Sequence, residues 1–229
     1  EEEHSEIVEI ACSKRFRDIT PYEIVPLLAE EGRYIASVSS FYRVLGKAGL
    51  VFYSKRRKRR RKKVEPIELK ATRPYEIISW DISWLKTNIK GKYYYLYMFV
   101  DIWSRYIVGW QVHEEESGAL AKELLNEIAS RTGVKGTVLH SDNGGPMICS
   151  TMRATLEKLE VIASFSRPSV SNDNAYSESL FKTLKYTAGY HRSFKNIEQA
   201  REWVSKFVHW YNHEHRHSKI GYVTPLQRL

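Results

Sequence analysis

A run of nine basic residues, Lys55 to Lys63, interrupts this chain of 229 residues. Nine like charges side by side repel one another and cannot be buried, so no hydrophobic core can extend through them. The chain holds 36 Lys and Arg residues against 27 Asp and Glu residues, so the run accounts for the entire net charge of +9. We expect two folded parts, residues 1–54 and residues 73–229, joined by a basic linker over residues 55–72.

The basic run has two interpretations. One is a targeting signal or a solubility segment, and the other is a clamp whose cationic side chains neutralise nucleic-acid phosphates and release their counterions. Its position between two structured parts favours the clamp. The residues that we then expect to contact DNA are Lys55, Arg56, Arg57, Lys58, Arg59, Arg60, Arg61, Lys62 and Lys63.

The composition argues against secreted and membrane-spanning proteins. Two cysteines, Cys12 and Cys149, are too few for a disulfide framework, and no CxxC zinc pair is present. The longest apolar run, residues 93–100, is far too short to cross a bilayer. No apolar stretch follows the acidic residues 1–3, so we expect no signal peptide. These features predict a protein of the reducing cytoplasm with no membrane partner.

Residues 1–54 carry the signals of two short helices. The sequence Thr20-Pro21-Tyr22-Glu23 combines a cap, a proline at the first helical position and a glutamate three residues after the cap, which predicts a helix to about residue 31. A second helix fits residues 37–47. Two such helices are typical of a helix-turn-helix, although any small helical hairpin gives the same pattern. The second helix would present Ser39, Ser40 and Arg43 to DNA.

The sequence after the linker has the pattern of strands and helices that is typical of a mixed α/β fold. From Ile78 to Trp84 apolar and polar residues alternate strictly, so Asp81 lies on the polar face of the first predicted strand. Further strands are expected at residues 93–100, 106–112, 137–140 and 161–165, and helices at residues 117–131, 151–159, 175–186 and 196–211. A three-strand meander followed by alternating helices and strands predicts a sheet with helices on both sides.

Three acidic residues stand where such a fold would expose them. Asp81 is on a polar strand face, Asp142 follows the fourth strand in a Gly-rich loop, and Glu178 is on the outward face of a helix. Each has an ordinary explanation on its own: a strand-edge polar group, a turn residue, and an i,i+4 partner of Lys182. Asp101, at the end of a buried strand, could supply a fourth ligand, but we favour a structural pairing with Arg105.

Two further groups carry competing interpretations. Asp173 reads as a turn residue and His140 as a strand residue rather than a base. His209, His213, His215 and His217 could suggest a zinc site, but the later pair lies beyond the predicted helix end and no cysteine accompanies them. We therefore favour packing or substrate contacts for these histidines.

The motifs W-D-I on the first strand, S-D-N-G after the fourth and N-x-x-x-E-S-x-F-K-x-L-K on a late helix occur together. With the ending H-R-S-F-K-N through G-Y-V-T-P, they resemble the DDE transposases of bacterial insertion sequences, and more narrowly the insertion-sequence-three family. The resemblance covers residues 73–229 and, weakly, the helices before them. It implies an RNase H-like, retroviral-integrase-like core over residues 73–190, with a C-terminal helix and His-rich tail over residues 191–229.

The resemblance also implies a function. Asp81, Asp142 and Glu178 would form a metal-binding triad for two Mg²⁺ or Mn²⁺ ions, since oxygen-only ligation favours these cations. The protein would bind the terminal inverted repeats of its element, free a 3′-OH and join it to target DNA, as a homodimer or larger assembly on the bacterial nucleoid. Alternatives are an RNase H-like nuclease or resolvase without joining, and a non-catalytic DNA-binding regulator. Further expected DNA contacts are Asn174, Lys182, Lys185, Arg216 and His217.

Overall fold

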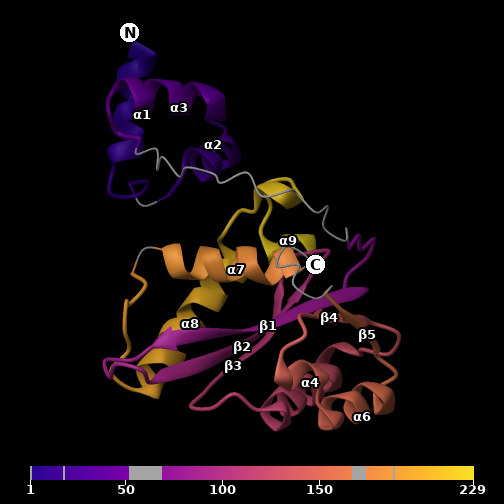
Figure 1. Ribbon diagram of the computed structural model, residues 1–229. Helices are drawn as coiled ribbons and strands as arrows, with labels where there is room; N and C mark the ends of the chain where they lie inside the picture. The colour runs from indigo at the N-terminus through magenta and orange to yellow at the C-terminus, as the bar shows by residue number, and fades with distance from the viewer. Residues whose placement is uncertain (1, 18, 52–68, 167–173, 188) are drawn as a thin grey trace, which may run out of the picture. The chain divides into compact units, whose positions relative to one another are not determined.

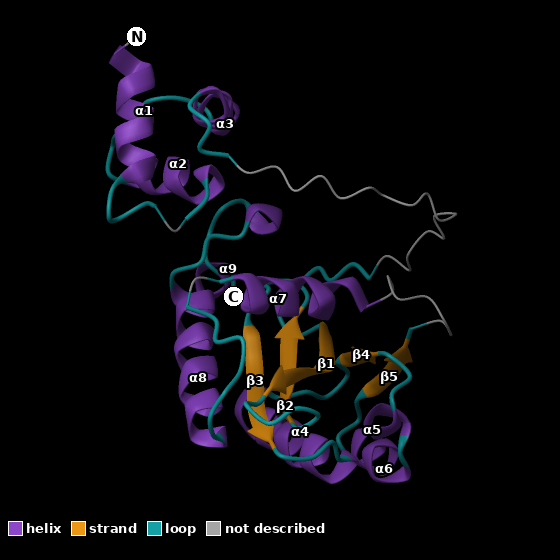
Figure 2. Cartoon of the chain, turned by 60° about the vertical axis from the view of Figure 1, so that its left-hand side comes forward, coloured by secondary structure: helices purple, strands orange, loops and turns teal. Residues whose placement is uncertain are grey.

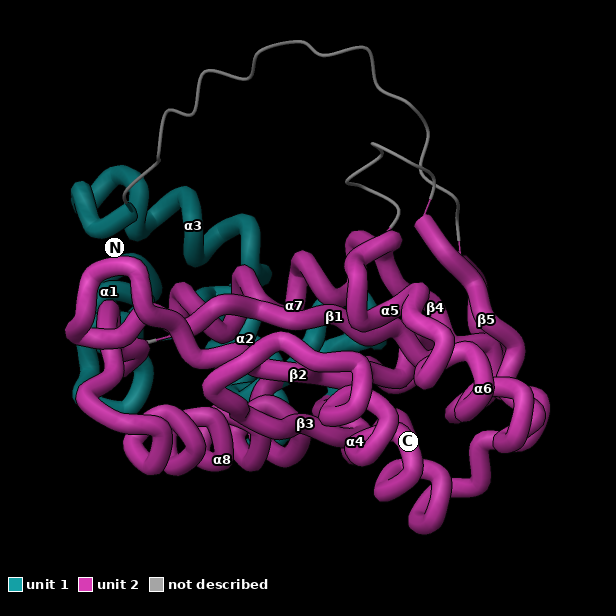
Figure 3. Tube along the Cα trace, turned by 60° about the horizontal axis from the view of Figure 1, so that its bottom comes forward, with its two compact units in different colours: residues 1–63, 216–223 teal, residues 64–215, 224–229 magenta. Residues whose placement is uncertain are grey.

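The computed structural model describes residues 2–17, 19–51, 69–166, 174–187 and 189–229 (Figure 1). The basic run and Asp173 lie outside the described residues. The chain forms two compact units, drawn in two colours in Figure 3: residues 1–63 with 216–223, and residues 64–215 with 224–229. The segment 216–223, which we expected to group with the C-terminal helix, thus belongs to the first unit. No helix in the described ranges has the length and apolar character needed to cross a membrane.

Among its described residues, the first unit contains three α-helices: α1 (Glu2–Cys12), α2 (Pro21–Glu30) and α3 (Val38–Lys47). Both predicted helices are confirmed, and α2 begins with the expected capping box of Thr20 and Glu23. Helix α1 was not predicted from the sequence. Its two buried residues, Ile7 and Ile10, complete a core with the buried apolar side chains of α2 and α3. The first unit is therefore a three-helix bundle rather than a helical pair.

The second unit is built on a five-stranded sheet in the order β3-β2-β1-β4-β5 (Figure 2). The strands are β1 (Ile77–Lys86), β2 (Tyr93–Asp101), β3 (Ile107–His113), β4 (Val138–Ser141) and β5 (Ile162–Phe165). The first three form an antiparallel meander, whereas β4 pairs in parallel with both β1 and β5. The predicted fold class, a mixed sheet of a meander plus two further strands, is confirmed.

Helices cover both faces of this sheet because side chains alternate between the faces along each strand. Leu96, Met98 and Val100 of β2 pack with α7 (Ala175–Tyr186) and α8 (Ile197–His213). Tyr97 and Phe99, one register place away, pack on the other face with α4 (Gly118–Thr132) and α6 (Ser150–Lys158) (Figure 2). The second unit also contains the short helices α5 (Gly145–Ile148) and α9 (Pro225–Arg228), and the first unit contains the short 3-10 helix η2 (Ser218–Ile220). β1 and β2 thus lie inside the sheet, with a strand on each side and helices on both faces.

Candidate active site

Asp81 lies in β1 at the point where this strand loses one neighbour. Among the described residues, β4 pairs with β1 only over Ile77–Ser79, whereas β2 pairs with it to its end. Asp81 Oδ1 accepts a hydrogen bond from the backbone N–H of Ile82 at 2.8 Å. Burial raises the pKa of Asp81 to about 7, and the charges of Asp142 and Glu178 act in the same direction, against the hydrogen bond from Ile82. Asp81 is therefore a buried carboxyl group within the electrostatic reach of two others.

Asp142 comes immediately after β4. The parallel register aligns His140 of β4 with Ser79 of β1. Two residues further along each strand direction, Asp142 is therefore level with Asp81. The backbone N–H of Gly144 donates a hydrogen bond to Asp142 Oδ1 at 2.9 Å, which orients the carboxylate within its loop. The parallel pairing of two strands thus explains why acids 61 residues apart in sequence (142 minus 81) act on each other.

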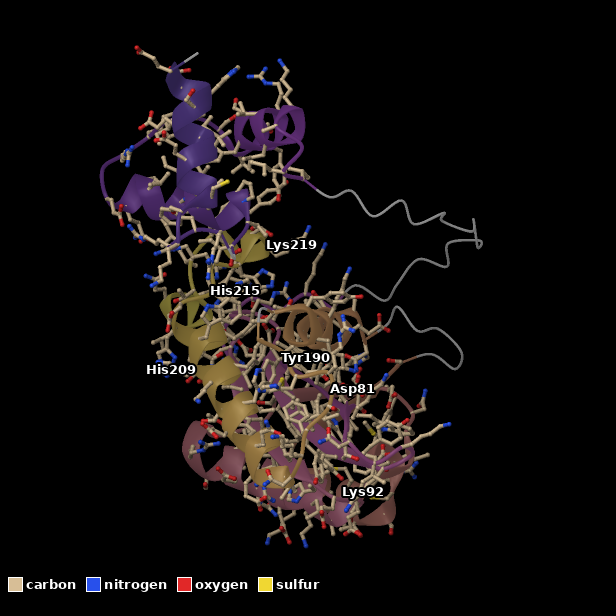
Figure 4. All side chains as sticks on the ribbon, turned by 90° about the vertical axis from the view of Figure 1, so that its left-hand side faces the viewer. Asp81, Lys92, Tyr190, His209, His215 and Lys219 are labelled. Atoms are coloured by element: carbon tan, nitrogen blue, oxygen red, sulfur yellow. The ribbon has the colours of Figure 1, made fainter. Side chains whose placement is uncertain are left out.

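Glu178 is carried by the first turn of α7, and buried hydrogen bonds tie the start of this helix to β1. Ser79 Oγ donates to Asn174 Oδ1 at 2.6 Å and lies 2.8 Å from Ser177 Oγ. Asn174 Nδ2 in turn donates to a β1 carbonyl oxygen at 3.3 Å. Because Ser79 shares a strand face with Asp81, this network sets α7 beside Asp81 (Figure 4). Partial burial raises the pKa of Glu178.

The donor chemistry of the three acids fits a hard divalent cation. Each carboxylate offers oxygen ligands only, and their negative charges repel one another, which adds to the larger effect of burial in raising the pKa of Asp81. A bound cation would relieve this repulsion, and oxygen ligation favours Mg²⁺ or Mn²⁺. Within the described ranges no three His, Cys, Asp or Glu side chains converge closely enough to hold a metal ion. The acids are thus electrostatic neighbours whose carboxylates would have to close up around a cation.

The raised pKa of Asp81 predicts a pH-dependent stability of the metal-free protein. At pH values between 3.8 and about 7, Asp81 of the folded chain, with a pKa of about 7, keeps a proton that Asp81 of the unfolded chain, with a pKa of 3.8, has lost. Deprotonation therefore costs folding energy, and Asp81 lowers the free energy of unfolding as pH rises through this window, by at most ~1.4 kcal/mol per pH unit.

The comparison of wild type with Asp81→Asn isolates this contribution, since asparagine does not titrate. We expect urea unfolding in EDTA at pH 5 and at pH 7 to show a steeper loss of stability for wild type than for the variant. Equal pH dependence of the two proteins would mean that Asp81 titrates normally.

Asn174 and the two lysines of α7 were predicted as DNA contacts, but they differ in exposure to solvent. The Asn174 side chain is buried and hydrogen bonded to β1, so it serves the protein interior rather than an open surface. Lys182 and Lys185 follow Glu178 along the helix and are exposed. Burial lowers the pKa of Lys185, the nearby Asp81 charge raises it, and Lys86 lowers it again. Lys185 therefore lies beside the acidic site.

The predicted contacts of α3 lie on its outer side. Ser39 and Arg43 are exposed, while Ser40 is half-buried. The backbone N–H of Ser40 donates to the side chain of Ser37, the N-cap of α3, at 3.3 Å. Ser39 and Arg43 are thus accessible to a ligand, and Ser40 contributes to the start of the helix.

Arg216 and His217 have partners inside the first unit. Arg216 forms an ion pair with Glu30, and its Nη1 donates to the Tyr222 carbonyl oxygen at 3.3 Å. His217 Nδ1 accepts a hydrogen bond from the backbone N–H of Lys219 at 3.2 Å and caps η2. Only 11% of the Arg216 side chain is exposed, so its guanidinium is largely engaged within the protein.

Two alternatives raised by the sequence have structural explanations. His209 and His213 stack at 4.4 Å, and the His215 ring packs against Trp210. Asp101 accepts hydrogen bonds from the backbone N–H groups of Tyr75 (2.9 Å) and Ser104 (2.8 Å). Asp101 and Arg105 pair through the backbone, because the N–H of Arg105 donates to the Asp101 carbonyl oxygen at 2.9 Å, while the Arg105 guanidinium lies 4.1 Å over the Tyr176 ring.

His140 is a buried strand residue, as predicted, with its Nδ1 2.9 Å from Ser164 Oγ. The anchoring residues Ser79 and Ser177 were not predicted from the sequence. The strict alternation of β1 did contain a signal for Ser79, since it shares a face with Asp81. Ser177 gave no such signal, because an exposed helix serine has the same sequence pattern.

The fold is that of retroviral integrases. The structure matches a simian T-cell lymphotropic virus intasome chain with a TM-score of 0.59 and 16% sequence identity, covering 91% of this chain and 74% of that chain. It also matches the HTLV-2 integrase catalytic core domain, solved in complex with magnesium, with a TM-score of 0.50 and 15% identity over 69% of this chain and 99% of that chain. At this level of identity the likeness defines the architecture, an RNase H-like core.

Sequence comparison defines the family. Residues 71–171 and residues 159–225 match two family models that are each described as integrase core domain. The transposase for insertion sequence element IS904 of Lactococcus lactis subsp. lactis (strain IL1403) is 28% identical over 158 residues, which cover 68% of this chain and 62% of that protein. Transposase InsF for insertion sequence IS3A of Escherichia coli (strain K12) is 30% identical over 159 residues, which cover 69% of this chain and 54% of that protein. The chain therefore belongs to the integrase-core transposases of the IS3 family. It spans between 54% and 62% of the length of these two relatives.

Proposed function

We propose that the chain is a transposase that cleaves DNA at the ends of an insertion sequence and joins the freed 3′-OH to another phosphodiester. The observation that carries this proposal is that the charges of Asp142, in the loop after β4, and of Glu178, on α7, both act on the buried Asp81 of β1 in an integrase-core protein. Carboxylates that repel one another are retained where a cation offsets their repulsion. The RNase H-like architecture and the IS3 relatives support the same reaction class.

The three acids would hold two Mg²⁺ or Mn²⁺ ions, which when bound activate an attacking oxygen and stabilise the leaving oxygen of an in-line displacement at phosphorus. Asp81 supplies its carboxylate from a rigid central strand, and Asp142 from a loop fixed by Gly144. The hydrogen bonds of Ser79 hold the start of α7, which carries Glu178, against β1, and Glu178 would complete the ligand set from there. Metal binding requires Asp81 to release its proton, which its raised pKa opposes at low pH.

The remaining surfaces would bind the substrate, double-stranded DNA. Lys182 and Lys185 are placed to hold phosphates of the cleaved end beside Glu178, because both follow it on the exposed side of α7. Ser39 and Arg43 on α3 would contribute to recognition of the terminal inverted repeats. The basic run Lys55–Lys63 would neutralise further phosphates. Joining two ends calls for at least two copies of the chain, acting in the bacterial cytoplasm at the nucleoid.

A strand-transfer assay tests this function. The protein is incubated with Mg²⁺ and labelled DNA that carries the end of its element, and the products are separated by size. We expect both cleaved ends and longer joined products. Cleavage without joining would identify a nuclease or resolvase instead, and binding without cleavage a DNA-binding regulator with an inert core.

A further inference from the structure

Three aromatic side chains form a cluster on the β1–β2 hairpin, in which Trp84 is exposed and Tyr93 and Tyr95 are half-buried. Trp84 is 51% exposed, and its ring centroid lies 5.3 Å from that of Tyr93 and 5.8 Å from that of Tyr95. The antiparallel register places Trp84 directly opposite Tyr95, so both side chains point to the same sheet face. We call Trp84, Tyr93, Tyr95, Lys86 and Lys90 the hairpin surface.

The exposure of Trp84 contrasts with the burial of the same face further back along β1. Trp80, four residues earlier, is 1% exposed and stacks on Phe99 at 5.0 Å, in the core that α4 and α6 cover. Apolar contacts with those helices therefore protect Trp80, while half of the Trp84 side chain meets solvent. A large aromatic side chain left exposed beside two others is typical of a binding surface.

Basic side chains border this aromatic cluster. Lys86, Lys90 and Lys92 are exposed on the hairpin, and Lys92 (labelled in Figure 4) lies 3.6 Å from Glu114. The segment around Phe194 pairs with the hairpin at Thr87, which brings two more exposed cations alongside. These two cations are Arg192 and Lys195. These five cations outnumber the three exposed glutamates that follow His113 of β3, which pairs with Tyr95, so the surrounding charge is net positive and complements a phosphate backbone.

The hairpin surface lies near the candidate active site on β1, although Trp84 and Asp81 point to opposite faces of the sheet. Trp84 is three residues beyond Asp81, a distance of about 10 Å along a strand. Beyond Ser79, β4 no longer pairs with β1 in the described chain, so the two sheet faces are connected around this edge. Lys86 lies near enough to Lys185 of α7 for its charge to lower the pKa of that lysine. A DNA strand leaving Asp81 could therefore reach Trp84 within a few nucleotides.

We propose that the hairpin surface binds unpaired nucleotides of the DNA strand next to the cleaved phosphate, with bases stacked on Trp84 and phosphates held by the lysines. This inference rests on the proposed function for the identity of the substrate. The accessible ring favours single-stranded DNA, since stacking requires the face of an unpaired base, which a duplex conceals. A second copy of this chain would have to accommodate the lysines around the cluster, so we favour DNA.

A binding experiment with the whole chain in EDTA tests this proposal without catalysis. The probes are a short oligothymidine with one central 2-aminopurine and a duplex of equal length, each followed by fluorescence. We expect Trp84→Ala to weaken binding of the single strand by roughly 5- to 100-fold and to abolish the quenching of 2-aminopurine. Duplex binding should change little, because the other basic residues remain.

Two matched variants serve as controls. Trp84→Phe retains a ring and should keep most of the quenching, whereas Ile162→Ala removes an exposed apolar side chain (57% exposed) on β5 and should change nothing. Equal single-strand binding and quenching by wild type and Trp84→Ala would overturn the proposal. It would also be overturned if Trp84→Ala only dissociated an oligomer in sedimentation. Normal quenching by a wild type that never cleaves DNA would refute the transposase function and leave the hairpin surface intact.

Discussion

Replacing Asp142 by asparagine is expected to abolish both cleavage and joining, with a loss of at least about 10³-fold in rate, or about 4 kcal/mol in the activation barrier. Asparagine keeps an oxygen that can accept the hydrogen bond from Gly144, so the loop geometry should be retained. It removes the negative charge that a divalent cation needs, and this change accounts for the predicted loss. The rate is measured in the strand-transfer assay on labelled DNA ends.

The same substitution should not damage the fold. The charge of Asp142 raises the pKa of Asp81, so its removal relieves repulsion, and the metal-free melting temperature should rise. A control variant is Glu157→Gln, which neutralises an exposed acid on α6, away from the three carboxylates, and should leave both activities unchanged. A fall of several degrees in the melting temperature of Asp142→Asn would indicate a structural role for Asp142 instead.

Neutralising part of the basic run is expected to have the second-largest effect, on DNA affinity. Each cation that contacts a phosphate contributes about −0.9 to the slope of log K against log salt concentration, so replacing Arg59, Arg60 and Arg61 by alanine should reduce the slope by up to ~2.7. At about 0.15 M salt this corresponds to a loss of affinity on the order of 10²-fold. Fluorescence anisotropy with labelled DNA over a range of salt concentrations measures both quantities.

A variant with the same change in net charge separates the linker from general electrostatics. Lys122, Arg153 and Lys158 lie on α4 and α6, and their joint replacement by alanine also removes three positive charges. We expect a much smaller change in slope, because long-range charge is screened within about 8 Å at physiological salt. If the two triple variants lost affinity equally, the run would act only through the net charge of the protein.

The strands of the core were predictable because their periodicity is local. The alternation from Ile78 to Trp84 identified β1 and the face that carries Asp81, and the meander followed from short connections. Helix α1 was not predicted, since only Ile7 and Ile10 of its eleven residues become buried, and their burial depends on helices elsewhere in the chain. Periodicity finds an element whose core-facing stripe is long, and it misses one whose stripe consists of two residues.

The positions of the acids were predictable, but the contacts that hold them were not. Asn174 precedes a helix, where a polar residue ordinarily indicates a cap or a surface contact, yet its amide bonds to β1. Asp101 precedes Arg105 by four residues, but the turn directs its carboxylate to Ser104 and Tyr75. Both outcomes depend on which strands and helices meet in three dimensions, and sequence separation alone does not encode that meeting.

Anomalous diffraction from crystals grown with Mn²⁺ tests the central claim most directly, since it locates the cation without any assay of activity. We predict anomalous peaks bounded by the carboxylates of Asp81, Asp142 and Glu178, and their loss in crystals of Asp142→Asn. Mn²⁺ bound elsewhere, with these three side chains left apart in a protein that still joins DNA, would contradict the account.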